Sequence, residues 1–351
     1  MDERNTRVVS FNQLEEGMIL AKDVEQNGRI LLKKDIPISR QMIKRIQGLL
    51  FIGNVIIYDK KVQKNIVKKK EPNKVEEGFK EIALKLPKTF RKLINENGVA
   101  MNEIREFSQK IHSELKPSSL VIKNIVLYGS GTDSIYRHGV NVAALSGLLG
   151  KWLGFDTAEL NLLEYSAILH DFGKTKIDRE VLDKEAALTP NELKVIKTHA
   201  QVGYKFIKNI SFLDKAVSYG VLMHHERIDG SGYPLGLKGE EIHPFARIIA
   251  IADVFDAINS DRKYKKKKLP FEALQIVKDE SLGKLDYEYV KVFLEHIVGY
   301  YIGEEVLLNT NQKCKIIQMN INDLEKPLIL KNDEFIDLEK EKNLYIKEML
   351  F

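Results

Sequence analysis

The sequence contains a single cysteine, Cys314, among its 351 residues. One thiol cannot build an internal disulfide framework, and this scarcity is typical of proteins from a reducing compartment. The sequence also lacks any apolar run close to the roughly 18 uninterrupted residues that a membrane-spanning helix requires. Its first residues, MDERNTRVVSF, lack the apolar stretch of a secretory signal. We therefore expect no membrane span and a cytoplasmic location.

Positive charge exceeds negative charge only slightly, since the formal net charge is +5. This value is compatible with an anionic ligand but too small to indicate duplex DNA, so we predict no DNA partner. Basic residues gather in two places, Lys60–Lys74 and Arg262–Lys268. We interpret the first cluster as solvated surface. Hydrophobic residues make up 44% of the chain, which is enough for the cores of two or three domains.

The two ends of the chain differ from its middle. Residues 1–60 show strand-like segments around an Asn-Gly hairpin signal and predict a small α/β module with a packing or regulatory role. Residues 61–115 predict a linker followed by helices, and residues 301–351 predict a small β subdomain of short strands. Helical periodicity dominates residues 116–300. The expected fold class is therefore mostly α, with an all-helical domain flanked by two small modules.

Histidines are concentrated in the helical middle, where five of the eight fall between positions 138 and 225. Each occupies an inward position among apolar residues at helical spacing or stands at the end of such a helix. The four inward positions, each predicted on a different helix, are His138, His170, His199 and His224, and His225 adjoins the last. An inward histidine is commonly a satisfied core residue, but four of them in one helical region favour a shared site.

Two carboxylates accompany these histidines. Asp171 directly follows His170, and Asp253 interrupts the apolar helix RIIAIADVFDAI. Ionised carboxylates in an apolar core cost many kcal/mol unless they are compensated, and divalent cations compensate them. Imidazole and carboxylate donors suit iron or manganese best, with zinc, magnesium and nickel as alternatives. Two ions roughly 3.5–4 Å apart would hold a bridging hydroxide for attack at phosphorus, so the pattern predicts phosphodiester hydrolysis.

Lys174 follows Asp171 by three residues, just beyond the predicted end of the helix. We predict that its ammonium contacts a substrate phosphate and takes part in catalysis; the alternative is an ordinary solvated lysine at a helix C-terminus. His112 stands beside an earlier apolar stripe without a partner motif, and we interpret it as structural.

Five separated segments, taken together, resemble the HD-GYP family, a branch of the HD metal-dependent phosphohydrolases. The segments are YRHGVNVA, LLEYSAILHDFGKTKI, IKTHAQVGYKFI, HHERIDGSGYP and ARIIAIADVFDAINSDRKYK. They occur in the family's order, cover residues 116–300 and keep the signature Gly232-Tyr233-Pro234 intact. The resemblance implies an HD-type helical domain that hydrolyses the bacterial second messenger cyclic di-GMP.

The resemblance also implies a role for each matching residue. The residues that would hold one metal are His138, His170, Asp171 and Asp253. Asp171 would bridge to a second metal, which is completed by His199, His224 and His225. The residues that would contact substrate are Lys174, Arg262, Lys265 and Tyr233. Two roles stay open for Tyr233: it stacks on a base, or it contacts a partner domain such as a diguanylate cyclase. A homodimer also stays open.

One departure from the family pattern bears on the number of metals. Members with three metals carry a glutamate four residues before the first ligand histidine, where this chain has Ser134. We therefore expect two metals and linear pGpG, rather than GMP, as the main product. Two alternatives stay open. One is a catalytically weak cyclic-dinucleotide receptor that acts through partners, and the other is a hydrolase of a different cyclic dinucleotide.

Overall fold

The computed structural model describes residues 6–26, 29–36, 38, 42–43, 54–58, 74–114, 118–130, 135–184, 186–260, 269–332 and 334–350. The chain divides into two compact units. We call residues 73–293 the helical unit, and residues 1–72 together with 294–351 the β-rich unit.

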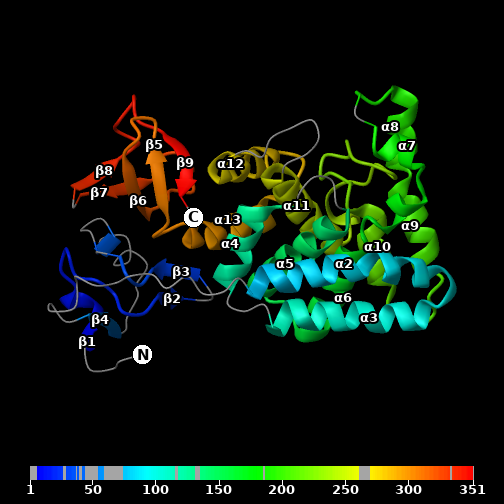
Figure 1. The fold of residues 1–351 in the computed structure, drawn as a ribbon, viewed down its shortest axis with the longest axis horizontal. Coiled ribbons are helices and arrows are strands. Elements are labelled where there is room, and N and C mark those ends of the chain that lie inside the picture. Colours follow the sequence, from blue (N-terminus) through cyan, green and yellow to red (C-terminus); the bar gives the residue numbers. More distant parts are fainter. Residues whose placement is uncertain are drawn as a thin grey trace. The chain divides into compact units, whose positions relative to one another are not determined.

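The helical unit consists mainly of helices. They are α2 (Lys74–Asn95), α3 (Asn97–Gln109), the π-helix η3 (Lys110–Glu114), α4 (Ser118–Tyr128), α5 (Ile135–Trp152), α6 (Thr157–Leu169), the 3-10 helix η4 (Phe172–Lys176), α7 (Arg179–Leu182), α8 (Pro190–Lys197), α9 (His199–Ile207), α10 (Lys215–Met223), the 3-10 helix η5 (Gly239–Glu241), α11 (Pro244–Asn259) and α12 (Pro270–Glu280); α13 (Tyr287–Ile297) starts in this unit. Helices α2 and α3 run alongside each other (Figure 1). The predicted mostly-α fold class is confirmed.

Local sequence explains where these helices begin. The Asp156 side chain accepts a hydrogen bond from the backbone N–H of Glu159, and the Glu159 side chain closes a capping box at the start of α6. Thr189 and Glu192 form the same arrangement at α8, whose first residue is Pro190. Both starts match the sequence prediction.

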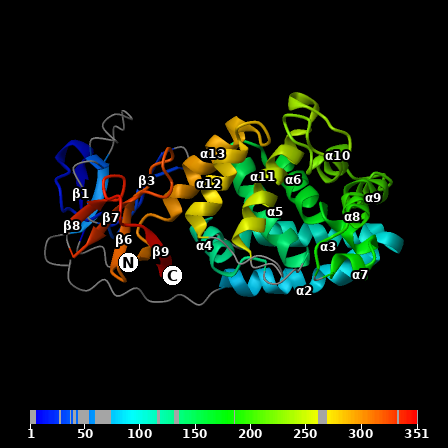
Figure 2. The same cartoon turned by 90° about the horizontal axis from the view of Figure 1, so that it is seen from above.

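Helix α5 lies at the centre of the helical unit and packs against α2, α6 and α11 (Figure 2). Nearly every residue from Arg137 to Gly147 is buried, because neighbours cover α5 on several sides. A helix that is apolar around most of its circumference belongs in a core. Any polar side chain on α5 therefore needs a partner inside the protein.

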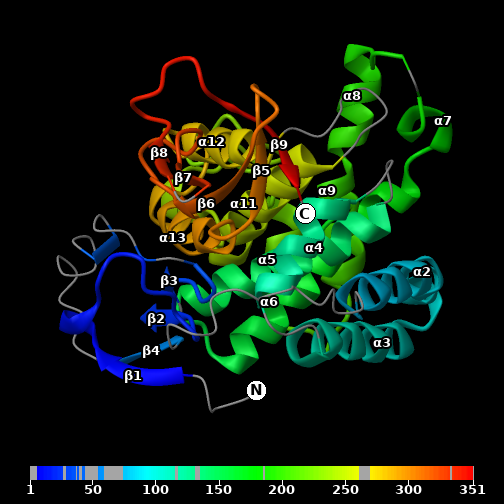
Figure 3. The same cartoon turned by 60° about the vertical axis from the view of Figure 1, so that its left-hand side comes forward.

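The described residues of the β-rich unit form three antiparallel sheets. Strand β1 (Thr6–Ser10) pairs with β4 (Asn54–Tyr58), and β2 (Val24–Gln26) pairs with β3 (Arg29–Leu32) as the hairpin signal predicts. The third sheet has the order β8-β7-β6-β5-β9 (Figure 3). Its strands are β5 (Glu305–Leu308), β6 (Lys313–Gln318), β7 (Leu328–Lys331), β8 (Glu334–Asp337) and β9 (Ile346–Leu350). The predicted domain boundaries at 60, 115 and 300 stay a prediction.

None of the helices within the described ranges combines the length and the apolar character that crossing a bilayer would require.

Candidate metal centre

Five helices, and the residues that directly follow two of them, bring the predicted ligands together. His138 lies in the first turn of α5, and His170 ends α6 with Asp171 directly after it. His199 begins α9, His224 ends α10 with His225 next, and Asp253 lies in the middle of α11. Most of these side chains are buried, and His199 and His224 are fully so. All seven predicted metal ligands thus belong to one cluster.

The first half of the cluster contains His138, His170 and Asp171. Their ligand atoms all lie within 4.8 Å of one another. Asp171 Oδ2 is 3.4 Å from His170 Nε2 and 3.9 Å from His138 Nε2. Asp253 Oδ1 approaches His138 Nε2 to 3.1 Å, so a second carboxylate faces the same space. Two imidazoles and two carboxylates are a donor set suited to a first-row divalent ion.

The second half contains Asp171 with His199, His224 and His225, again within 4.8 Å of one another. Here the other carboxylate oxygen faces the histidines, since Asp171 Oδ1 is 3.4 Å from His199 Nε2. His199 Nε2 is 3.2 Å from His224 Nε2. Asp171 therefore offers one oxygen to each group, which is the arrangement of a carboxylate that bridges two ions.

The orientation of three histidine rings suits metal binding. Nδ1 of His170, His199 and His224 lies 2.7, 2.7 and 2.8 Å from the carbonyl oxygen three residues earlier in the chain. A ring that donates Nδ1–H in this way presents the lone pair of Nε2 to the cluster. Among the described residues, His170 Nε2 and Asp171 Oδ1 are buried without a hydrogen-bond partner. Buried polar atoms are rarely left unpaired, so these two atoms are suited to bind a divalent cation.

Around Asp171 and the second group of histidines, burial and nearby charges favour the protonation states that ligands need. Burial lowers the pKa of His199, His224 and His225, which keeps the rings neutral. Burial opposes ionisation of Asp171, but the Lys174 ammonium and the His170 ring outweigh it and hold the pKa of this carboxyl well below its usual range. Neutral imidazoles around an ionised carboxylate are ready to bind a divalent cation.

Lys174 projects from η4 and donates to Asp171 Oδ2 at 2.7 Å. The turn is tight because Gly173 contacts the first residue of α9: a Cβ on Gly173 would lie 1.9 Å from the carbonyl oxygen of His199. The structure ends α6 at Leu169, so Lys174 lies on η4 rather than just beyond the end of α6, and Gly173 has a packing role. Gly173 thereby lets the turn that carries Lys174 pack directly against the first residue of α9.

The loop after His225 covers the second half of the cluster. The Tyr233 ring stacks on the His225 ring with a centroid separation of 4.6 Å, and the Lys197 ammonium lies 5.0 Å from the Tyr233 ring centroid. The buried Glu226 carboxylate accepts the backbone N–H groups of Leu235 and Leu237 at 2.6 and 3.1 Å. This role of Glu226 was not predicted from the sequence. The feature that could have indicated it is a carboxylate directly after a pair of histidines.

Gly232 leaves no space for a side chain in this loop, because a Cβ there would lie 2.4 Å from Glu226 Cα and from Arg227 N. We therefore expect Gly232→Ala to displace the loop and Tyr233, and to lower turnover at least about tenfold while metal content stays normal. Gly98→Ala is the matched control, since its methyl would meet no atom within 4 Å. Turnover assays with metal analysis check this expectation, and equal behaviour of the two variants would contradict it.

The predicted residues Arg262, Lys265 and Ser134 lie outside the described residues. Their proposed roles, as substrate contacts for the first two and as the position that limits the site to two metals for the third, stay predictions.

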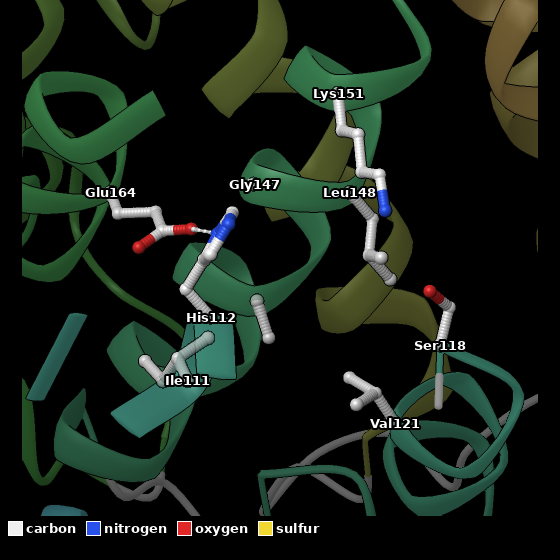
Figure 4. Close-up of a pocket in the computed structure, with 9 residues that line it drawn as sticks. Ile111, His112, Ser118, Val121, Gly147, Leu148, Lys151 and Glu164 are labelled. Atoms are coloured by element: carbon white, nitrogen blue, oxygen red, sulfur yellow. Dashed lines mark hydrogen bonds and ion pairs between the residues drawn. The ribbon is translucent and has the colours of Figure 1, made fainter. Parts of the chain in front are cut away.

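A second cluster of ionisable groups lies apart from these ligands, around a cavity of about 40 Å³. Figure 4 shows Glu164 and His112 on one side of it, and Lys151 and Ser118 on the other. Glu164 is buried on α6, its carboxylate accepts from Ser108, and His112 Nδ1 lies 3.4 Å from its other oxygen. His112, which we interpreted as structural without a partner, thus has one.

Burial raises the pKa of Glu164 to about 7, and the hydrogen bond from Ser108 lowers it only partly. The folded protein therefore holds this proton more tightly than the unfolded chain, so stability falls as pH rises from about 5 to 8. We expect Glu164→Gln to be nearly neutral at pH 5 and stabilising by up to about 3 kcal/mol at pH 8. Urea unfolding at both pH values tests this, with exposed Glu180→Gln as control; a pH-independent difference would contradict it.

Comparisons with known proteins agree with this geometry. The model of the HD domain family matches residues 85–288. The chain is 39% identical over 169 residues to the cyclic di-GMP phosphodiesterase response regulator RpfG of Xanthomonas campestris, covering 47% of this chain and 42% of RpfG. It is 30% identical over 213 residues to the cyclic di-GMP phosphodiesterase PA4108 of Pseudomonas aeruginosa, covering 61% and 51%.

A third relative has a different substrate in its name. The chain is 32% identical over 197 residues to the 3'3'-cGAMP-specific phosphodiesterase 1 of Vibrio cholerae, covering 56% of this chain and 45% of that protein. The chain thus spans about half the length of the relatives that it matches.

Proposed function

Because this chain belongs to the HD domain family, we propose that it is a metal-dependent phosphodiesterase that hydrolyses cyclic di-GMP to linear pGpG. The observation that carries the proposal is Asp171, whose two carboxylate oxygens face two different groups of histidines. The names of the relatives RpfG and PA4108 support the choice of cyclic di-GMP as substrate.

We assign the ligands by the two groups. One ion would be held by His138, His170, Asp171 and Asp253, and the other by Asp171, His199, His224 and His225. Their imidazole and carboxylate donors favour iron or manganese. Bound divalent ions would acidify water and neutralise charge on the scissile phosphate.

Two further side chains act on substrate in this proposal. The ammonium of Lys174 stays beside Asp171, keeps that carboxylate ionised and donates to a non-bridging phosphate oxygen. The half-buried ring of Tyr233 stacks on His225 and offers a flat surface to a guanine base or a partner domain. The predicted phosphate contacts of Arg262 and Lys265 belong to the same proposal. We place the reaction in the cytoplasm, where the single-cysteine chain would stay reduced.

The direct test is a product assay with purified protein. Protein loaded with Mn²⁺ or Fe²⁺ is expected to convert cyclic di-GMP into pGpG, detected by chromatography and ³¹P NMR, and chelation is expected to stop the reaction. A panel with 3'3'-cGAMP and pGpG ranks substrates, because the 3'3'-cGAMP-specific relative favours a hybrid dinucleotide as second candidate. Tight binding of cyclic di-GMP without product under every metal would instead identify a receptor and refute the hydrolase.

A further inference from the structure

A chain of buried hydrogen bonds starts at His138 and crosses from α5 to α11. His138 Nδ1 lies 2.7 Å from Asp256 Oδ2, and Asp256 is fully buried. Asn141 donates to Asp256 Oδ1 at 2.7 Å, and Ser130 donates to Asp256 Oδ2. Both oxygens of Asp256 are therefore engaged, and its position fixes the His138 ring.

The chain continues from Asn141 to the first turn of α2. Arg137 Nε donates to Asn141 Oδ1 at 3.1 Å, and Arg137 Nη2 donates to Glu76 Oε2 at 2.6 Å. Asn124 accepts from Arg137 at 2.9 Å and donates to Glu76 at 2.9 Å. Glu76, Asn124 and Arg137 are all buried, so water competes little for these contacts.

The hydrogen-bond partner of Nδ1 distinguishes His138 from three other predicted ligand histidines. His170, His199 and His224 each use the carbonyl three residues earlier in the chain, so the local backbone orients the ring. His138 is oriented by a carboxylate on a different helix, and that carboxylate is connected to two more helices, α4 and α2. Such outer partners of a ligand histidine set both its orientation and its basicity.

We propose that Asp256 and Glu76 are positioning residues for the ion held by His138 and Asp253, and that the first turn of α2 is a control point for that ion. This inference rests on the proposed metal site. Glu76 is the third residue of α2, and the preceding chain belongs to the β-rich unit. A displacement of the start of α2 reaches the His138 ion through Arg137 and Asn141, whereas the His199, His224 and His225 rings stay in place.

The test measures metal binding rather than turnover. In Mn²⁺ titrations followed by EPR and calorimetry, Asp256→Asn is expected to weaken one of two ions by about 10–100-fold. Glu76→Gln is expected to weaken the same ion by about tenfold and to leave the other unchanged. Glu77→Gln is the matched control, because Glu77 lies in the same turn but is exposed.

A double-mutant cycle then asks whether the two residues act through one route. If they do, Asp256→Asn with Glu76→Gln costs clearly less than the sum of the two single effects. Ser130→Ala, which removes only a hydroxyl that donates to Asp256, serves as a milder variant should Asp256→Asn fail to fold. Equal weakening of both ions, or unchanged binding in a folded Asp256→Asn or Ser130→Ala protein, overturns the proposal. Metal binding is measured without cyclic di-GMP. The test therefore stays valid even if the protein does not hydrolyse this substrate.

Discussion

Asp171→Ala is expected to remove both metal ions and to lower cyclic di-GMP hydrolysis by at least about 1,000-fold. The reason is that Asp171 belongs to both groups of potential ligands found among the described residues. Its two oxygens face His170 and His199 respectively, so replacing any single histidine is expected to affect fewer ions than replacing Asp171. His199→Ala is expected to remove one ion and to keep the other.

Elemental analysis of the purified variants measures this directly. We expect two ions per wild-type chain, one in His199→Ala and none in Asp171→Ala, with activity assayed on the same samples. Replacement of the exposed Glu240 by alanine controls for the loss of a carboxylate elsewhere in the helical unit. Two ions and activity within tenfold of wild type in Asp171→Ala would contradict the assignment of a bridging carboxylate.

Helical periodicity was sufficient to predict which histidines face inward. A position such as His138, at the start of an apolar stripe on α5, has few places to point once the helix is buried. The adjacency of His170 and Asp171 at a helix end likewise predicted that both would reach a common space. These are properties of one helix at a time, and a single sequence contains them.

Partners on different helices could not be predicted in this way. Asp256 lies one turn after Asp253 on α11, but only the folded chain brings it to Nδ1 of His138, 118 positions away in sequence. The contact between His112 and Glu164, 52 positions apart in sequence, is of the same kind. The β-rich unit shows a similar limit, since β1 pairs with β4 across much of the N-terminal segment. Such pairings depend on tertiary structure, which periodicity does not encode.

The ion at His138 is expected to bind about tenfold more tightly for each unit of pH between 6 and 8. Both ring nitrogens of His138 face carboxylates, with Nδ1 2.7 Å from Asp256 and Nε2 3.1 Å from Asp253. Burial alone would lower the pKa of this imidazole, but these two acids outweigh it and raise the pKa to about 10. In the metal-free protein His138 is thus an imidazolium throughout this range, and an ion must displace its Nε2 proton.

The second ion provides an internal control for this pH dependence. Burial lowers the pKa of His199, His224 and His225, so the deeply buried rings release no proton when they bind an ion near neutral pH. Calorimetric titration in buffers of different ionisation enthalpy should therefore detect about one proton released with one ion and almost none with the other. If the binding affinities of the two ions changed equally with pH, His138 would be neutral before metal binds. The assignment of His138 as an imidazolium between Asp253 and Asp256 would then be wrong.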